Sequence, residues 1–136
     1  MIIDDRPLGE QYASYQNSIR VKHINGPLFF GVIQKFKALM QNIPAETKVL
    51  IIRMEDVNYM DQSGLYAMEE TLLKLKKEHV VILLSGLQEQ PRHMLETIQL
   101  IPEVVLPIHL FESFSLSEQW LSEHIQELCA PFKPSE

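Results

Sequence analysis

Residues 49–72 read VLIIRMEDVNYMDQSGLYAMEETL, and this stretch decides the fold. Its first four residues are apolar and mostly β-branched without alternation, which is typical of a strand buried on both faces. From residue 65 onward, leucine and methionine recur at helical spacing with charged side chains between them, which predicts an amphipathic helix. A buried strand that leads through a loop at residues 55–61 into a helix is the repeating unit of an α/β fold.

The same alternation extends in both directions along the chain. We predict strands and helices over these ranges: strands at 19–23, 27–30, 48–54, 80–84 and 108–111, and helices at 32–43, 65–77, 91–98 and 115–128. The order is therefore β-β-α-β-α-β-α-β-α. Such an order requires right-handed crossovers and mostly parallel pairing, so we expect one mixed, mostly parallel sheet with about four helices packed on it.

Local signals predict how the ends of these elements are built. Asn25-Gly26 indicates a hairpin turn between the first two strands, because both residues tolerate positive φ. Ser115 to Glu118 reads Ser-Leu-Ser-Glu, a capping box expected to open the last helix. Residues 1–18 are polar without a sustained period and are predicted to be a linker or arm. We expect the domain to span residues 19–129, followed by a flexible tail at 130–136.

Length and composition exclude several classes of protein. A chain of 136 residues suits one domain, and its formal charge of −6 opposes a phosphate backbone, so nucleic acid is not expected as a partner. The single cysteine, Cys129, and the absence of a signal-peptide pattern fit a reducing cytoplasm. The longest apolar runs, 49–52 and 80–84, are far shorter than the ~20 residues that span a bilayer, so the chain itself is expected to be soluble.

Signatures of catalysis and metal binding are missing from the sequence. The five histidines never form the i, i+4 pair that places two imidazoles on one helix face. Ser63 follows a loop and opens a helix like a nucleophile elbow, but Asp61 stands where that motif needs its first glycine. We therefore expect no catalytic residue, no metal and no cofactor.

The turn from Asp61 to Leu65 is the remaining candidate site. Asp61 and Ser63 are both good N-cap residues, and Gly64 allows close packing, so the turn can be nothing more than a well-capped helix start. The turn also follows the carboxyl end of a central strand, where α/β sheets place ligands and anions. Residue types alone leave both interpretations open.

The sequence resembles a known family from about residue 19 to residue 128. The strand at 49–52, the segment 57–65 and the helix containing Glu69 to Lys77 are similar to the core of STAS domains, which carry an Asp-Ser-Ser-Gly-like signature. Ser85-Gly86 and Pro91-Arg92 match the same pattern. Residues 21–31, which include Asn-Gly-Pro-Leu-Phe-Phe-Gly, resemble the first hairpin of the domain at the cytosolic C-terminal end of SulP sulfate and related anion permeases.

The resemblance implies a non-catalytic regulatory and interaction domain of a SulP-type transporter of sulfate or a related anion. Such a domain would lie at the cytoplasmic face of the cell (inner) membrane as part of a multi-pass transporter. Its partner would be the membrane transport domain of the same polypeptide or a cytosolic regulatory protein. The alternative is a stand-alone protein resembling anti-sigma-factor antagonists, which would bind a regulatory kinase.

One residue of the signature departs from the antagonist pattern. In antagonists the serine directly after the aspartate receives a phosphate, and this position is Gln62 here. A nucleotide ligand, implied for some STAS domains, has no support here beyond a helix N-terminus. The predicted binding or regulatory loop consists of Asn58, Tyr59, Asp61, Gln62, Ser63 and Gly64.

Overall fold

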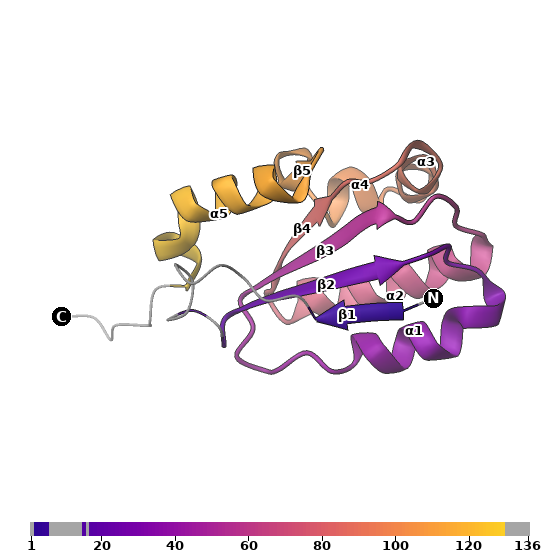
Figure 1. Cartoon of the computed structure of the whole chain (residues 1–136), viewed down its shortest axis with the longest axis horizontal. Helices are drawn as coiled ribbons and strands as arrows, with labels where there is room; N and C mark the ends of the chain where they lie inside the picture. Colours follow the sequence, from indigo (N-terminus) through magenta and orange to yellow (C-terminus); the bar gives the residue numbers. More distant parts are fainter. Residues whose placement is uncertain (1, 6–14, 16, 130–136) are drawn as a thin grey trace.

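The computed structural model describes residues 2–5, 15 and 17–129 (Figure 1). Within these residues, the sheet has five strands in the order β1-β2-β3-β4-β5. The strands are β1 (Ile2–Asp5), β2 (Ile19–Asn25), β3 (Val49–Asp56), β4 (Val81–Ser85) and β5 (Leu110–Phe111). β1 pairs antiparallel with β2, whereas every other pairing is parallel. The predicted mixed, mostly parallel sheet and the central position of β3 are confirmed.

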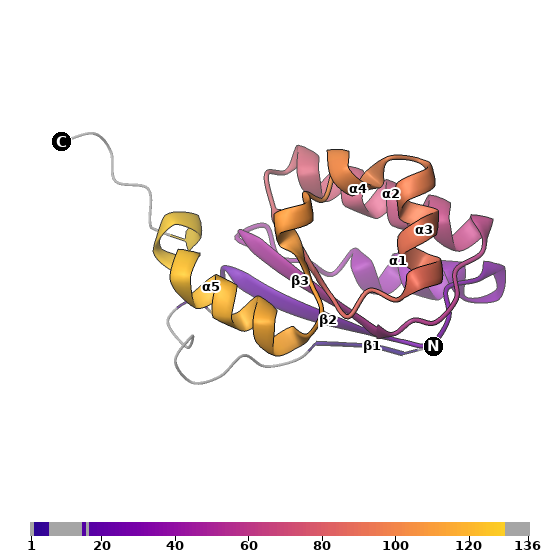
Figure 2. The ribbon, with the colours of Figure 1, turned by 90° about the horizontal axis from the view of Figure 1, so that it is seen from above.

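Helices cover both faces of this sheet. They are the 3₁₀ helix η2 (Phe30–Val32), α1 (Ile33–Met40), α2 (Gln62–Lys77), α3 (Glu89–Thr97), the short α4 (Leu100–Glu103), the 3₁₀ helix η3 (Pro107–His109) and α5 (Phe114–Cys129). Figure 2 shows α5 on one face and α1 to α4 on the other. The predicted α/β class is confirmed, with α4 as a short additional helix directly after α3.

β3 divides the apolar core into two layers because its side chains alternate between the faces. Leu50 and Ile52 belong to the larger core, which α1, α2 and α3 cover. Val49 and Ile51 belong to the smaller core, which α5 covers. All four side chains are 0% exposed. The uninterrupted apolar run therefore has the double burial that its lack of alternation predicts.

The predicted hairpin at Asn25-Gly26 is wrong. Gly26 does adopt a positive φ of 108°, but its N–H donates to the Asp56 carbonyl at 3.2 Å. The chain after Gly26 therefore continues past the end of β3 and does not turn back along β2. Leu28 then forms an isolated parallel bridge with Met60. The place beside β2 that a returning strand would need is taken by β1, so residues 27–30 leave the sheet and lead into η2.

The predicted arm at residues 1–18 is wrong in part, because residues 2–5 form β1. Ile2 lies opposite Asn25 and Asp5 opposite Lys22 in an antiparallel ladder. Four residues are too few to show a period, and the ladder is made by backbone groups that every residue type carries. The rest of the predicted arm, at 6–14 and 16, and the predicted tail at 130–136 lie outside the described residues.

The capping box predicted at Ser115 is also wrong. α5 begins at Phe114, and its first turn is closed by Ser113, whose Oγ accepts from the Leu116 N–H at 3.3 Å. Ser115 therefore lies within the helix. Serine occurs at both 113 and 115, so the local pattern offered two N-caps and the structure uses the earlier one.

Trp120 of α5 lies between two histidine rings on the smaller core. The His124 ring stacks on the indole at a centroid distance of 4.1 Å, and the His109 ring meets it edge-on at 5.1 Å. Burial lowers the pKa of His109, and the nearby charge of His124 lowers it further. His109 therefore favours its neutral form in the folded protein.

This arrangement predicts a pH-dependent loss of stability. Because the folded-state pKa of His109 lies below the unfolded value of about 6.5, the unfolded chain binds the proton first as the pH falls through that value. We expect the free energy of unfolding of His109→Gln to fall less than that of the wild type between about pH 7 and pH 5. Urea denaturation measures this difference. The matched control is His93→Gln, which makes the same replacement at an exposed histidine on α3.

Candidate functional site

The predicted loop lies where two segments run together beyond the carboxyl ends of β2 and β3. The Leu28 N–H donates to the Tyr59 carbonyl at 3.0 Å, and the Asp61 N–H donates to the Leu28 carbonyl at 3.0 Å. This edge of the molecule is at the right in Figure 1, where β2 and β3 end and α1 and α2 begin. The backbone of the loop is therefore fixed against the chain that leads into α1.

Asp61 joins the beginnings of two helices. Its Oδ1 accepts from the Gly64 N–H at 2.8 Å as the N-cap of α2, and its Oδ2 accepts from the Phe30 N–H at 3.0 Å at the start of η2. The N-cap role predicted for Asp61 is confirmed. Ser63, the other predicted cap, lies inside the first turn of α2. A helix has one N-cap position, and the aspartate occupies it.

A glutamine from α3 holds the same loop from the other side. The Gln90 side chain donates through Nε2 to the Met60 carbonyl at 2.9 Å and accepts through Oε1 from the Met60 N–H at 2.8 Å. Gln88 adds a donation to the Glu55 carbonyl at 2.6 Å. Sequence analysis missed both residues, because they lie more than 25 positions from the groups they bind and no local pattern links them.

Gly64 is needed because the backbone of Leu28 passes directly over it. A Cβ at position 64 would collide with the Leu28 carbonyl oxygen and would lie 2.9 Å from its carbonyl carbon. Both atoms belong to the segment that is hydrogen-bonded to Tyr59 and Asp61, so they have little room to move. The close packing predicted for this glycine is confirmed.

Gly64→Ala should therefore destabilise the protein by about 1–3 kcal/mol, the usual range for overpacking a fixed site. The matched control is Gly31→Ala, whose Cβ would meet only the Phe29 ring at 2.9 Å. Phe29 is 40% exposed and can move aside, so the control should change the free energy of unfolding by no more than about 0.5 kcal/mol. Equal denaturant midpoints for the two variants would contradict the assigned clash.

The six predicted site residues divide into an outward and an inward set. Asn58, Tyr59 and Gln62 are exposed, whereas Asp61 and Ser63 are half-buried and Gly64 is buried. The Asp61 carboxylate has both oxygens engaged by backbone N–H groups, so it is held as an acceptor in the turn. The outward set consists of two amides and one phenol, groups that suit contact with a partner surface.

Three further aromatic side chains surround this loop. Phe29 is 40%, Phe30 79% and Tyr66 57% exposed. Phe30 and Tyr66 line a groove of about 500 Å³ between the beginnings of α1 and α2, and Ser63 lies in its wall. Sequence analysis missed this surface, because it assigned Phe29 and Phe30 to a strand.

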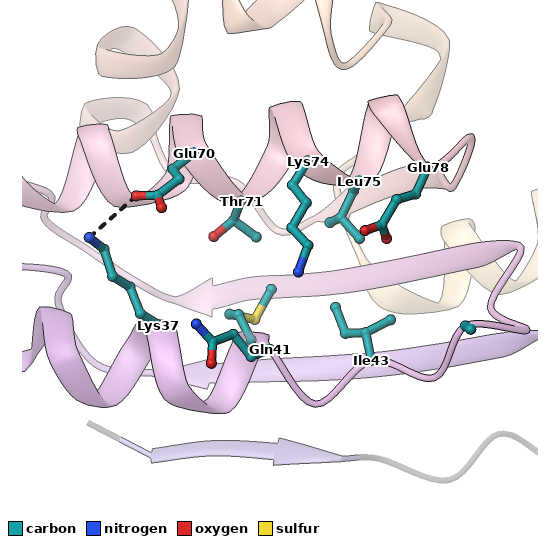
Figure 3. Close-up of a pocket in the computed structure, with 10 residues that line it drawn as sticks. Lys37, Gln41, Ile43, Glu70, Thr71, Lys74, Leu75 and Glu78 are labelled. Atoms are coloured by element: carbon teal, nitrogen blue, oxygen red, sulfur yellow. Dashed lines mark ion pairs between the residues drawn. The ribbon is translucent and has the colours of Figure 1, made fainter.

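A second groove of about 400 Å³ follows along the same two helices (Figure 3). Lys37 of α1 and Glu70 of α2 line both grooves and form an ion pair of 3.3 Å between them. Lys74 of α2 and Glu78, the residue directly after α2, project into the second groove. Both signs of charge are therefore present along this part of the molecule.

The carboxyl ends of the strands also carry polar side chains that bind one another. The His23 Nε2 and Asp56 Oδ2 atoms are 2.7 Å apart, and the Ser85 hydroxyl donates to the Glu55 carboxylate at 3.0 Å. Arg53 stacks over the Phe114 ring at 4.4 Å and approaches the same carboxylate at 3.4 Å. These contacts tie β2, β3, β4 and the start of α5 together at this edge.

Comparison with known proteins agrees with this geometry. A family model described as STAS domain matches residues 13–116. This chain belongs to the STAS domain family. Within residues 2–5, 15 and 17–129, no helix of this STAS domain has the length and apolar character needed to cross a membrane.

Relatives of this STAS domain are found among sulfate transporter proteins. The candidate sulfate transporter YvdB of Bacillus subtilis (strain 168) is 33% identical over 79 residues, which cover 57% of this chain and 15% of that protein. A solved sulfate transporter family protein from Wolinella succinogenes superposes with a TM-score of 0.68 at 27% identity, covering 79% of this chain and 88% of that one.

An anti-sigma factor antagonist from Mycobacterium paratuberculosis has the same fold. It superposes with a TM-score of 0.67 at 13% identity, covering 89% of this chain and 93% of that chain. At this identity the likeness shows the fold alone. The STAS domain described here is therefore related to domains of transporters, and its architecture is shared with antagonists.

Proposed function

We propose that this STAS domain is the regulatory domain of a SulP-type transporter of sulfate or a related anion, at the cytoplasmic face of the inner membrane. The observation that carries the proposal is the construction of the loop at residues 58–64. Its backbone is held by Asp61, Leu28 and Gln90, while Asn58, Tyr59 and Gln62 face outward. A surface of fixed shape suits a permanent contact, because little conformational entropy is lost when it binds.

The partner of this surface would be the membrane transport domain of the same polypeptide or a cytosolic regulatory protein. The similarity to YvdB supports the first partner, since this chain spans 15% of the length of that relative. No covalent step is needed for such a role. Regulation would instead act through a difference in contact between two states of the transporter.

A stand-alone antagonist is the second candidate, and the match over 93% of a whole antagonist chain supports it. The residue at position 62 opposes it. Gln62 is the first residue of α2 and is exposed, but its amide has no hydroxyl that could accept a phosphoryl group. Ser63 is half-buried against the groove between α1 and α2.

Intact-mass measurement after incubation with an anti-sigma-type serine kinase and ATP separates the two candidates. We expect no added phosphate on the natural chain. Gln62→Ser restores the hydroxyl at the helix N-terminus, where a phosphate is electrostatically favoured, and tests whether the scaffold still supports the reaction. Phosphate on the natural chain that maps to Ser63 would refute the transporter assignment and support the antagonist.

Anion uptake by the full-length transporter tests the contact surface directly. Replacing Tyr59 and Gln62 together by alanine should change the uptake rate by about fivefold or more at equal protein in the membrane, the usual size of coupling between sites. Leu73→Ala, an exposed residue on α2 beyond the first two turns, is the control and should leave uptake unchanged. A coding region without membrane-spanning segments before this domain would refute the proposal.

A further inference from the structure

Four aromatic side chains gather at one edge of the domain. Phe29 and Phe30 precede α1, Tyr59 lies in the candidate loop, and Tyr66 lies in the second turn of α2, and we call these four residues the aromatic edge. Leu28 and Met60 form a parallel bridge, so Phe29 and Tyr59 flank one bridged pair on its two sides, and Phe30 and Tyr66 line one groove. Their exposed fractions run from 40% to 79%.

Hydrogen bonds hold the backbone that carries the aromatic edge, although its side chains are exposed. The Phe30 N–H donates to the Asp61 carboxylate, and the backbone on either side of Tyr59 is bound by Leu28 and Gln90. Exposed rings carried on a held backbone gain nothing from their exposure within the domain itself. Several exposed aromatic side chains gathered at one edge indicate a binding site for a protein or a membrane.

The segments that form the edge are poor in charge. Residues 24–34 contain no charged side chain, and residues 57–68 contain only Asp61, whose two carboxylate oxygens are occupied by backbone N–H groups. In the whole chain 22% of the residues are charged. Lysines follow on α1, where Lys35 is exposed and Lys37 lies at the wall of the groove. Aromatic side chains flanked by lysine are characteristic of protein surfaces at the membrane–water interface.

The chain enters the fold at this same edge. Ile2, the first residue of β1, lies opposite Asn25, the last residue of β2, and Asn25 is four residues before Phe29. The following step rests on the proposed function, in which a membrane segment precedes β1. Such a segment would leave the bilayer close to the aromatic edge, so this edge and not the opposite end of the sheet would face the membrane.

We propose that the aromatic edge of this domain rests on the lipid surface of the membrane, with Phe30 inserted deepest. Phe30 has the largest exposed fraction of the four residues, and its ring has no polar group to keep hydrated. Tyr59 and Tyr66 have an apolar ring and a hydroxyl, which suit the headgroup layer. The groove that Phe30 and Tyr66 line also contains Gln34, Lys37, Ser63 and Glu70, polar groups that can remain in the hydrated headgroup region. The contact would fix the orientation of the domain beneath the transporter.

Sedimentation with phosphatidylcholine vesicles tests the proposal. In vesicles without an anchor, Phe30→Ser should lower the partition coefficient of the protein about tenfold, because burial of one phenylalanine ring is lost. Leu73→Ser is the matched control, since it removes a 47% exposed apolar side chain from α2 away from the edge and should leave the coefficient unchanged. In a second experiment, a histidine tag added to the N-terminus binds a nickel-chelating lipid, which holds β1 near the bilayer as a preceding membrane segment would.

Tryptophan quenching in the anchored state locates the contact. Phe30→Trp should be quenched by lipids with brominated acyl chains. The natural chain, which has only Trp120 on α5, and Leu73→Trp should not be quenched. Quenching of all three proteins alike, or of none, would overturn the proposal. If vesicles do not bind but uptake by the full-length transporter still depends on Tyr59 and Gln62, the edge faces protein and the proposed function stands. If the coding region lacks membrane segments, the proposed function itself fails.

Discussion

Both carboxylate oxygens of Asp61 accept hydrogen bonds from backbone groups, one in the first turn of α2 and one at the entrance to η2. Because α1 and α2 cover the same face of the sheet, this single side chain fixes where two walls of the larger core begin. The carbonyl of Leu28 lies between them and accepts from the Asp61 N–H, which leaves space only for a glycine at position 64. The outward residues of the loop are therefore carried on a backbone that the Asp61 carboxylate and the Leu28 carbonyl hold in place.

Sequence reasoning identified the elements whose burial pattern is local. β3 was evident from an apolar run without alternation, and α2 from leucine and methionine on one face, so both were predicted close to their true bounds. The turn at Asn25-Gly26 was misread because a positive φ at Gly26 permits several paths, and the chosen path depends on a distant carbonyl at Asp56. β1 could not be found, since a strand of four residues is too short to show a period.

The candidate site divides in the same way. Asp61 and Gly64 were predicted with their structural roles, because capping and close packing depend on residue type at a helix start. The hydrogen bonds from Gln90 to Met60 and the exposure of Phe29 and Phe30 depend on which segments meet in space. No periodicity in the sequence carries that information. A signature motif thus indicates where a site begins, whereas its working surface is completed by residues about 30 positions away in either direction.

The histidine-flanked indole of α5 also makes the two cores separately observable. Trp120 is the only tryptophan of the chain, and its ring contacts belong to the face that α5 covers. Its fluorescence therefore reports on the smaller core, whereas far-ultraviolet circular dichroism averages over helices on both faces. If the two unfolding curves coincide, the loss of one core leads to the loss of the other through β3, which both layers share. If the curves separate, α5 can detach while the larger core stays folded.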